Sequence, residues 1–169
     1  MIEETRVDPD LRALRALYEE HATALLRLGV ALTGDVGAAE DLVHDAFLRF
    51  HAVGARPGLG AERAYLRRTV VNLSLDRGRH QQVQGRLAPP PRPDVPSAEA
   101  DVLAVVRDRA VAAAVAALPP RQRACVVLHY FAGLSDAEVA ADLGVSVGSV
   151  KTHLHRARAA LARRLEDLR

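Results

Sequence analysis

Apolar residues recur at helical spacing along most of the chain, and no segment alternates apolar and polar residues long enough to make a sheet. The first helical stretch ends at Gly34, a residue suited to a helix C-terminus, and Asp35 follows as an N-cap for a second helix. That second helix ends near Gly54. A third helix begins shortly before Tyr65 and is expected to end near Gly78. The pattern predicts an all-α fold.

Five prolines interrupt the helical pattern between residues 81 and 100, and neither a helix nor a central strand accepts such a cluster. These residues are Pro89, Pro90, Pro91, Pro93 and Pro96. A proline cluster between helical regions is typical of an extended, semi-rigid linker. We therefore expect two small helical domains, residues 1–80 and 101–169, joined by a Pro-rich linker over residues 81–100.

The helical pattern resumes after the linker. A helix that starts around Leu103 breaks at Pro119-Pro120, and another covers about 121–132. A short helix over 136–143 and a long helix over about 147–167 complete the second domain.

The segment from Leu134 to Leu154 has the features of a helix-turn-helix. Ser135 is a good N-cap, and Glu138 three residues later completes a capping box. Gly144 allows the left-handed turn between the two helices. Because the second helix of this motif enters the DNA major groove, the segment predicts binding to duplex DNA. The alternative is a plain helical hairpin that packs and binds nothing.

The charge of the long last helix favours DNA binding over the plain hairpin. Between Lys151 and Arg164 there are five basic residues and no acidic one. The same helix carries an apolar stripe of Val150, Leu154, Ala157, Leu161 and Leu165. One face can therefore pack while the other meets phosphates and bases. Base contacts usually come from the start of such a helix, where the candidates are Ser149, Lys151, Thr152, His155 and Arg156. Later positions, expected to meet phosphate or solvent, are Arg158, Arg163 and Arg164.

A second basic cluster lies on the third helix, together with an aromatic and an amide side chain. Its members are Arg63, Tyr65, Arg67, Arg68, Asn72, Arg77, Arg79 and His80. Such side chains suit single-stranded or unstacked nucleic acid, although a solvated arginine-rich face explains them equally well. The preceding helix is acidic, with Glu40, Asp41 and Asp45, which favours a protein-docking face because like charge repels phosphate. A favourable interaction with the helix dipole is the alternative.

Composition by itself is almost neutral about function. The chain has 169 residues, 49% of them hydrophobic, and a net charge of only +2. The two ends of the chain differ in net charge. Residues 1–80 hold 11 basic and 12 acidic residues, whereas residues 119–169 hold 8 basic and 5 acidic ones. Of the 23 basic residues 22 are Arg, which suits phosphate and guanine contacts but is explained as well by genomic base composition. No apolar run reaches the roughly 18 residues of a membrane helix, and no secretory leader opens the chain, so we expect a cytoplasmic protein.

Catalysis and metal binding have little support in the sequence. There is no phosphate-binding Gly loop and no zinc-protease motif. The single cysteine, Cys125, cannot form an intrachain disulfide or a Cys-rich zinc site. His153 and His155 point about 200° apart on a helix and cannot chelate one metal. Cys125 and His129 are four residues apart and could share a face, but a buried thiol beside a histidine explains them. We expect no enzyme activity, no cofactor and no metal.

Three blocks of sequence, in this order, resemble the extracytoplasmic-function (ECF) group of bacterial RNA polymerase sigma factors over nearly the whole chain. The polymerase-binding part of sigma region 2 is similar to LTGDVGAAEDLVHDAFLRFHA at 32–52. The segment that melts and recognises the −10 promoter element is similar to AYLRRTVVNLSLDRGRH at 64–80. Sigma region 4 is similar to ALPPRQRACVVLHYFAGLSDAEVAADLGVSVGSVKTHLHRARAAL at 117–161.

The resemblance implies an alternative sigma factor that binds core RNA polymerase and directs promoter-specific transcription initiation. The implied polymerase contacts are Asp41, Leu42, Asp45 and Phe47. The implied contacts with melted −10 DNA are Arg63, Tyr65, Arg67, Arg68, Asn72, Arg77 and Arg79. The implied contacts with duplex −35 DNA are Ser149, Lys151, Thr152, His155, Arg156 and Arg158. An anti-sigma factor is a further implied partner. No domain follows residue 169 here, so we expect no regulation by a C-terminal extension.

The chain departs from the family pattern at a few positions. Phe50 and Tyr65 stand where Trp is common, and both keep an aromatic ring. Asp45 keeps a negative charge with a shorter reach than the more frequent Glu. His153 and His155 stand where Arg or an apolar or aromatic residue is frequent, so the −35 sequence does not follow from the resemblance.

Two alternatives to the sigma interpretation remain at this point. An ordinary helix-turn-helix regulator would explain residues 119–167 but not the first domain. A helical interaction module, for example one held by an anti-sigma protein, is compatible with the sigma interpretation as a regulatory state.

Overall fold

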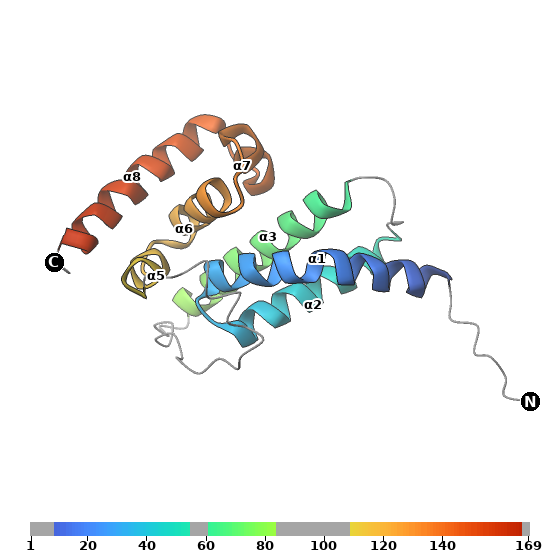
Figure 1. Ribbon diagram of the computed structural model, residues 1–169. Coiled ribbons are helices and arrows are strands. Elements are labelled where there is room, and N and C mark those ends of the chain that lie inside the picture. Colours follow the sequence, from blue (N-terminus) through green and yellow to red (C-terminus); the bar gives the residue numbers. More distant parts are fainter. Residues whose placement is uncertain (1–8, 55–60, 84–108, 167–169) are drawn as a thin grey trace, which may run out of the picture.

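The computed structural model describes residues 9–54, 61–83 and 109–166, and every element in these ranges is a helix (Figure 1), which confirms the all-α prediction. The N-terminal half consists of α1 (Pro9–Thr33), α2 (Val36–Ala52) and α3 (Glu62–Val83). The C-terminal half consists of α5 (Arg109–Ala116), α6 (Pro120–Val126), its π-helical continuation η2 (Val127–Phe131), α7 (Asp136–Leu143) and α8 (Val147–Glu166). No helix in these ranges is both long and apolar enough to cross a membrane.

The break between α1 and α2 lies where the sequence predicts it. α1 ends at Thr33, directly before Gly34, and Asp35 caps the next helix. The Asp35 carboxylate accepts a hydrogen bond of 2.7 Å from the backbone N–H of Ala38, one of the N–H groups that a helix start leaves without a partner. Local chemistry alone therefore sets this boundary.

The end of α3 lies beyond the prediction. The helix continues through Gly78 to Val83, so the expectation that it stops near Gly78 was wrong, and the first three residues of the expected linker are helical. Gly costs a helix about 1 kcal/mol relative to Ala, and Gly78 lies against Pro120 of α6. A Cβ at position 78 would lie 3.4 Å from Cγ of Pro120. Residues 84–100 of the expected linker, and Leu103 of the predicted next helix, lie outside the described residues.

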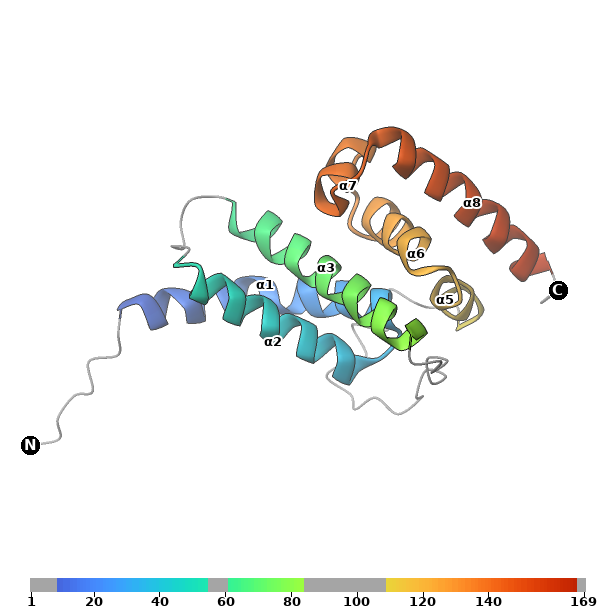
Figure 2. The same cartoon turned by 180° about the vertical axis from the view of Figure 1, so that it is seen from behind.

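The N-terminal half is a bundle in which α1, α2 and α3 pack against one another. Ala39, Ala46, Leu66, Val70 and Val71 are completely buried between them. The small alanines allow α2 to approach α1, and the larger residues of α3 fill the remaining space. Figures 1 and 2 show α2 on the side of this bundle away from the C-terminal half.

The C-terminal half packs α8 across α5, α6 and α7. Two arginines bind the carbonyl groups at the end of α5, which have no partner within that helix. The guanidinium of Arg123 donates a hydrogen bond of 2.6 Å to Ala116 O, and Arg164 donates one of 3.4 Å to Ala117 O. Burial lowers the pKa of Arg123 from its usual value. Arg164, expected to meet phosphate or solvent, thus also has a structural partner.

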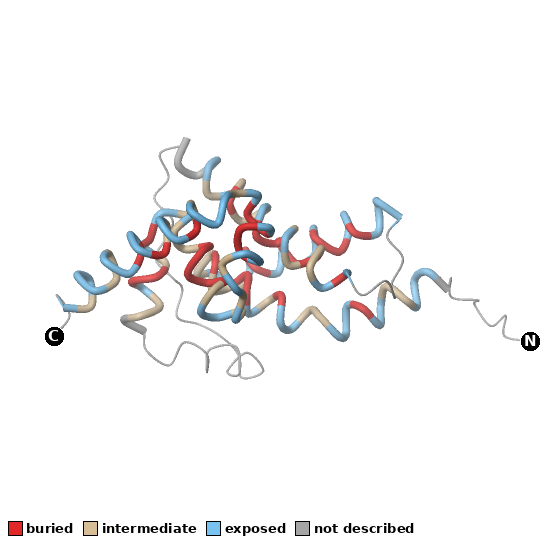
Figure 3. The backbone as a smooth tube through the Cα atoms, turned by 90° about the horizontal axis from the view of Figure 1, so that it is seen from above, coloured by how far each residue is buried: buried red, intermediate tan, exposed pale blue. Residues whose placement is uncertain are grey.

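The two halves lie against each other. α3 contacts α6 and α7, while α1 contacts α5, α6 and η2. Buried side chains from both halves form one continuous apolar cluster. Figure 3 shows the buried stretches gathered in the middle of the molecule, with the start of α1 and the end of α8 largely exposed. The contact between the two halves is therefore part of the hydrophobic core.

Candidate nucleic-acid interface

The first helix of the predicted helix-turn-helix begins with a complete capping box. The backbone N–H of Glu138 donates to Ser135 Oγ at 3.3 Å, and the Ser135 N–H donates back to Glu138 Oε2 at 2.9 Å. The Ser135 hydroxyl also donates to the same carboxylate at 2.7 Å. These hydrogen bonds lower the pKa of Glu138, since they favour its charged form. The structure confirms the predicted cap, which orients α7.

The turn between α7 and α8 depends on Gly144. Its backbone is left-handed, with φ 63° and ψ 38°, a conformation that strains residues with a Cβ. Ser146 then caps α8, because its hydroxyl accepts a 3.1 Å hydrogen bond from the N–H of Ser149. Val139 and Val150 are completely buried where the two helices cross. The helix-turn-helix geometry predicted from the sequence is present.

The outer face of α8 carries five of the six predicted −35 residues. Lys151, Thr152, His155, Arg156 and Arg158 are exposed. The sixth, Ser149, is half-buried, and its hydroxyl hydrogen-bonds to that of Ser146 at 2.9 Å. In the part of the chain that the structure describes, no ion pair engages Lys151, Arg156 or Arg158. This face therefore combines free cations with a buried apolar back, which suits contact with a polyanion.

His153 differs from its neighbour His155 because it is half-buried on the inner side of α8. Burial first, and then the positive charges of Arg121 and Arg156, lower the pKa of His153. The lowered pKa favours the neutral form of this imidazole. The opposite orientation of the two histidines follows from their spacing of two residues.

The basic cluster of α3 is less uniformly available than that of α8. Arg63, Arg68, Asn72, Arg77 and Arg79 are exposed, as expected for DNA contacts. Two of these arginines have acidic partners: Arg77 lies 3.5 Å from Asp41 of α2, and Arg79 pairs with Asp76. Tyr65 is half-buried, with its ring 5.5 Å from that of Phe50 and nearly perpendicular to it.

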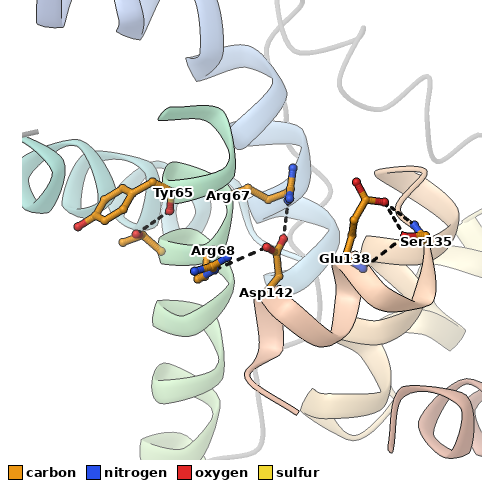
Figure 4. A network of polar contacts seen from close by, with 7 residues as sticks. Tyr65, Arg67, Arg68, Ser135, Glu138 and Asp142 are labelled. Carbon is orange, nitrogen blue, oxygen red and sulfur yellow. Dashed lines mark hydrogen bonds and ion pairs between the residues drawn. The ribbon is translucent and has the colours of Figure 1, made fainter. Parts of the chain in front are cut away.

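Arg67 and Arg68 of α3 bind a residue that sequence analysis missed, Asp142 of α7 (Figure 4). Arg67 Nε donates to Asp142 Oδ2 at 2.5 Å, and Arg68 Nε lies 3.7 Å from Oδ1. Only 2% of Asp142 is exposed. Its partners are 75 and 74 residues earlier in the chain, and no local pattern in the sequence marks such a pairing.

The predicted polymerase contacts on α2 separate into two pairs. Asp41 and Asp45 are exposed, whereas Leu42 and Phe47 are buried. The ring of Phe47 packs 4.9 Å from that of Tyr18 on α1. Leu42 and Phe47 thus lie in the core of the bundle, and only the acidic pair of the predicted set is exposed in this arrangement. Leu48, 54% exposed beside them, is an apolar candidate that the sequence interpretation did not consider.

Comparison with protein families gives two matches that together cover most of the chain. The family described as Sigma-70 region 2 matches residues 17–83, and the family described as Sigma-70, region 4 matches residues 108–161. A relative, the ECF RNA polymerase sigma factor SigL of Mycobacterium tuberculosis, is 35% identical over 92% of this chain and 90% of its own. The chain belongs to the ECF sigma factors. Its function is therefore promoter-specific initiation of transcription.

Two solved structures share this fold, and the first of them is an extracytoplasmic function sigma factor. SigJ of Mycobacterium tuberculosis is 31% identical with a TM-score of 0.67, over 87% of this chain and 52% of SigJ. CnrH, solved in complex with the cytosolic domain of CnrY, is 27% identical with a TM-score of 0.62, over 94% of this chain and 91% of CnrH. The N-terminal half of this sigma factor lies largely within the region 2 match, and the C-terminal half largely within the region 4 match.

Proposed function

We propose that α8 recognises the −35 promoter element as a duplex. The observation that carries this proposal is its exposed basic face, for which the described ranges hold no acidic partner, on the second helix of a helix-turn-helix. The start of the helix supplies base contacts, and later positions contact phosphates. The proposed contact residues are Ser149, Lys151, Thr152, His155, Arg156 and Arg158.

The α3 helix, in this proposal, contacts the melted −10 element. Its exposed arginines attract the phosphates of a single strand, and the exposed amide of Asn72 can hydrogen-bond to an unpaired base. Tyr65 supports this surface by packing on Phe50. The proposed contact residues are Arg63, Tyr65, Arg67, Arg68, Asn72, Arg77 and Arg79.

The α2 helix supplies the surface for core RNA polymerase. α2 lies on the side of the bundle away from the C-terminal half (Figures 1 and 2). Asp41, Asp45 and the apolar Leu48 are exposed on this helix. An acidic surface suits a basic protein partner and repels DNA. The proposed contact residues remain Asp41, Leu42, Asp45 and Phe47. Leu42 and Phe47 are buried in this arrangement, and exposed Leu48 is added to the set.

The remaining expectations belong to the same proposal. The domains are residues 1–80 and 101–169 with a linker over 81–100, and the added helical turn to Val83 belongs to the first domain. CnrH was solved with the cytosolic domain of CnrY, and an anti-sigma protein is proposed as a partner here. The protein acts by binding rather than by catalysis, in the cytoplasm where polymerase and promoters meet.

Transcription with purified components tests this division of labour. The chain with core polymerase should give promoter-specific transcripts that neither gives alone. Asp41→Ala should weaken binding to core polymerase and leave the affinity for an isolated −35 duplex unchanged, because α2 and α8 lie on opposite sides of the molecule. Glu20→Ala, which removes an exposed acid from α1, is the matched control. If Asp41→Ala weakened both interactions equally, the assignment of α2 would be wrong.

A further inference from the structure

We propose that Asp142 is a latch that holds the C-terminal half closed over Arg67 and Arg68 and so masks part of the −10 surface, while the −35 surface of α8 stays open. The inference rests on the −10 role proposed above for α3. It concerns the protein in the closed arrangement of its two halves that the structure describes.

The geometry makes the ion pair and the closed arrangement depend on each other. Asp142 is buried, and the Arg67 side chain is only 17% exposed. A buried carboxylate without a partner is strongly destabilising, so Asp142 is tolerated in the interior only while the arginines of α3 neutralise it. When the halves separate, water can solvate all three charges. The pair therefore stabilises only the closed form.

The rest of the contact between the halves is close at some points and incomplete at others. At the far end of α3, Gly78 lies against Pro120, and near the end of α1, Gly34 lies near Ala116. An open pocket of about 270 Å³ lies next to Arg67, lined by α1, the start of α3 and the end of η2. The contact between the halves is therefore interrupted by this open pocket beside the latch.

Closure affects the two DNA-binding surfaces differently. A phosphate of the −10 strand has to displace Asp142 from Arg67, because both anions bind the same guanidinium. Among the residues that the structure describes, the cations of α8 from Lys151 to Arg158 face no such competitor, and the helix lies on the outer side of the C-terminal half (Figures 1 and 2). The apparent affinity for −10 DNA is therefore reduced by the fraction of molecules that are open.

Asp142→Asn tests the latch because it removes the charge and keeps the shape. Labels at Ala61→Cys and Ala137→Cys, on exposed positions next to α3 and on α7, report the separation of the halves by energy transfer. The native Cys125 should not take a label, since it is completely buried and burial raises its pKa to about 11. We expect a longer distance between the labels and about tenfold tighter binding of a single-stranded −10 oligonucleotide. Binding of a −35 duplex should change by less than about twofold, because that surface is already open. Glu166→Gln, which removes an exposed acid from α8, is the control.

A reversible disulfide between the halves distinguishes the effect of their opening from the local effect of removing the Asp142 charge. In the closed arrangement, a Cβ at position 78 lies 3.6 Å from Cβ of Pro120, within the range of a disulfide. The double substitution Gly78→Cys and Pro120→Cys should hold the halves closed when oxidised and release them when reduced. In this background Asp142→Asn should tighten −10 binding only in the reduced protein.

Three outcomes would overturn the latch. One is an unchanged label distance in a folded Asp142→Asn protein, and another is opening without tighter −10 binding. The third is an equal gain in −10 affinity in the oxidised, disulfide-locked protein. That result would show that Asp142 acts through its charge alone. Failure of the proposed −10 role gives a different result: Arg67→Ala with Arg68→Ala would leave −10 recognition by the polymerase complex intact, whatever the label distance shows.

Discussion

The two arginine-rich helices of this sigma factor, α3 and α8, differ in how their charges are used. On α3, Arg67 and Arg68 bind Asp142, Arg77 lies near Asp41, and Arg79 pairs with Asp76. On α8, none of the cations from Lys151 to Arg158 has an ion-pair partner within the described residues. Two helices that are alike in composition therefore differ in the charge they offer to DNA.

The difference follows from their places in the fold. α3 packs against α1 and α2 on one side and against α6 and α7 on the other, so acids from its own chain reach its arginines. α8 covers one side of its half and is open on the other. Exposed ion pairs such as those of Arg77 and Arg79 contribute at most about 1 kcal/mol, and phosphates can replace them. Only the buried partner, Asp142, gives α3 a contact that DNA cannot easily displace.

The largest expected effect tests whether the two halves behave as one folded unit. Leu66 of α3 and Leu128 of η2 are both completely buried. Because both halves share one apolar cluster, Leu66→Ala or Leu128→Ala should each lower the free energy of unfolding by about 2–5 kcal/mol and shift a single transition. Chemical unfolding followed by circular dichroism measures this. Leu48→Ala, at an exposed position, is the control and should have little effect. Two transitions, each moved by only one of the buried variants, would mean that the halves fold independently.

A smaller effect is expected on the open surface of α8. Arg156→Ala should weaken binding to a −35 duplex by about 1–3 kcal/mol if this arginine contacts a base through two hydrogen bonds. Fluorescence anisotropy with the free protein is sufficient, since the closed form leaves α8 accessible. Arg163→Ala, in the last turn, is the matched control and should cost less. Equal losses from both variants would show that α8 attracts DNA by general charge and does not recognise bases.

The smallest effect compares the helix caps of the two halves. Asp35→Ala at the start of α2 and Ser135→Ala at the start of α7 should each lower stability by about 1 kcal/mol, because each leaves a helix N–H without its partner. Thermal unfolding measures both. Thr23→Ala, at an exposed position inside α1, provides a control without a cap. If the Ser135 variant had no effect, the capping box would not contribute to the position of α7.

Much of the fold could be predicted from the sequence because its signals are local. The Asp35 cap, the Ser135 and Glu138 capping box and the Gly144 turn each act within a few residues of the chain. The spacing of apolar residues also predicted the inner stripe of α8, and with it the outer face. The end of α3 could not be predicted in this way, because a glycine weakens a helix without ending it, and α3 continues past Gly78 to Val83.

The sequence by itself determined the helices, the helix-turn-helix and the family, since these depend on short-range chemistry and on motifs that stand in a fixed order. Only the tertiary structure decided which of the candidate residues are accessible. Leu42 and Phe47 are buried because α1 packs on α2, although exposed acids surround them in the sequence. Arg67 and Asp142 are paired because two helices far apart in the chain lie side by side. Such a pairing depends on the relative positions of whole elements, which no periodicity or local spacing encodes.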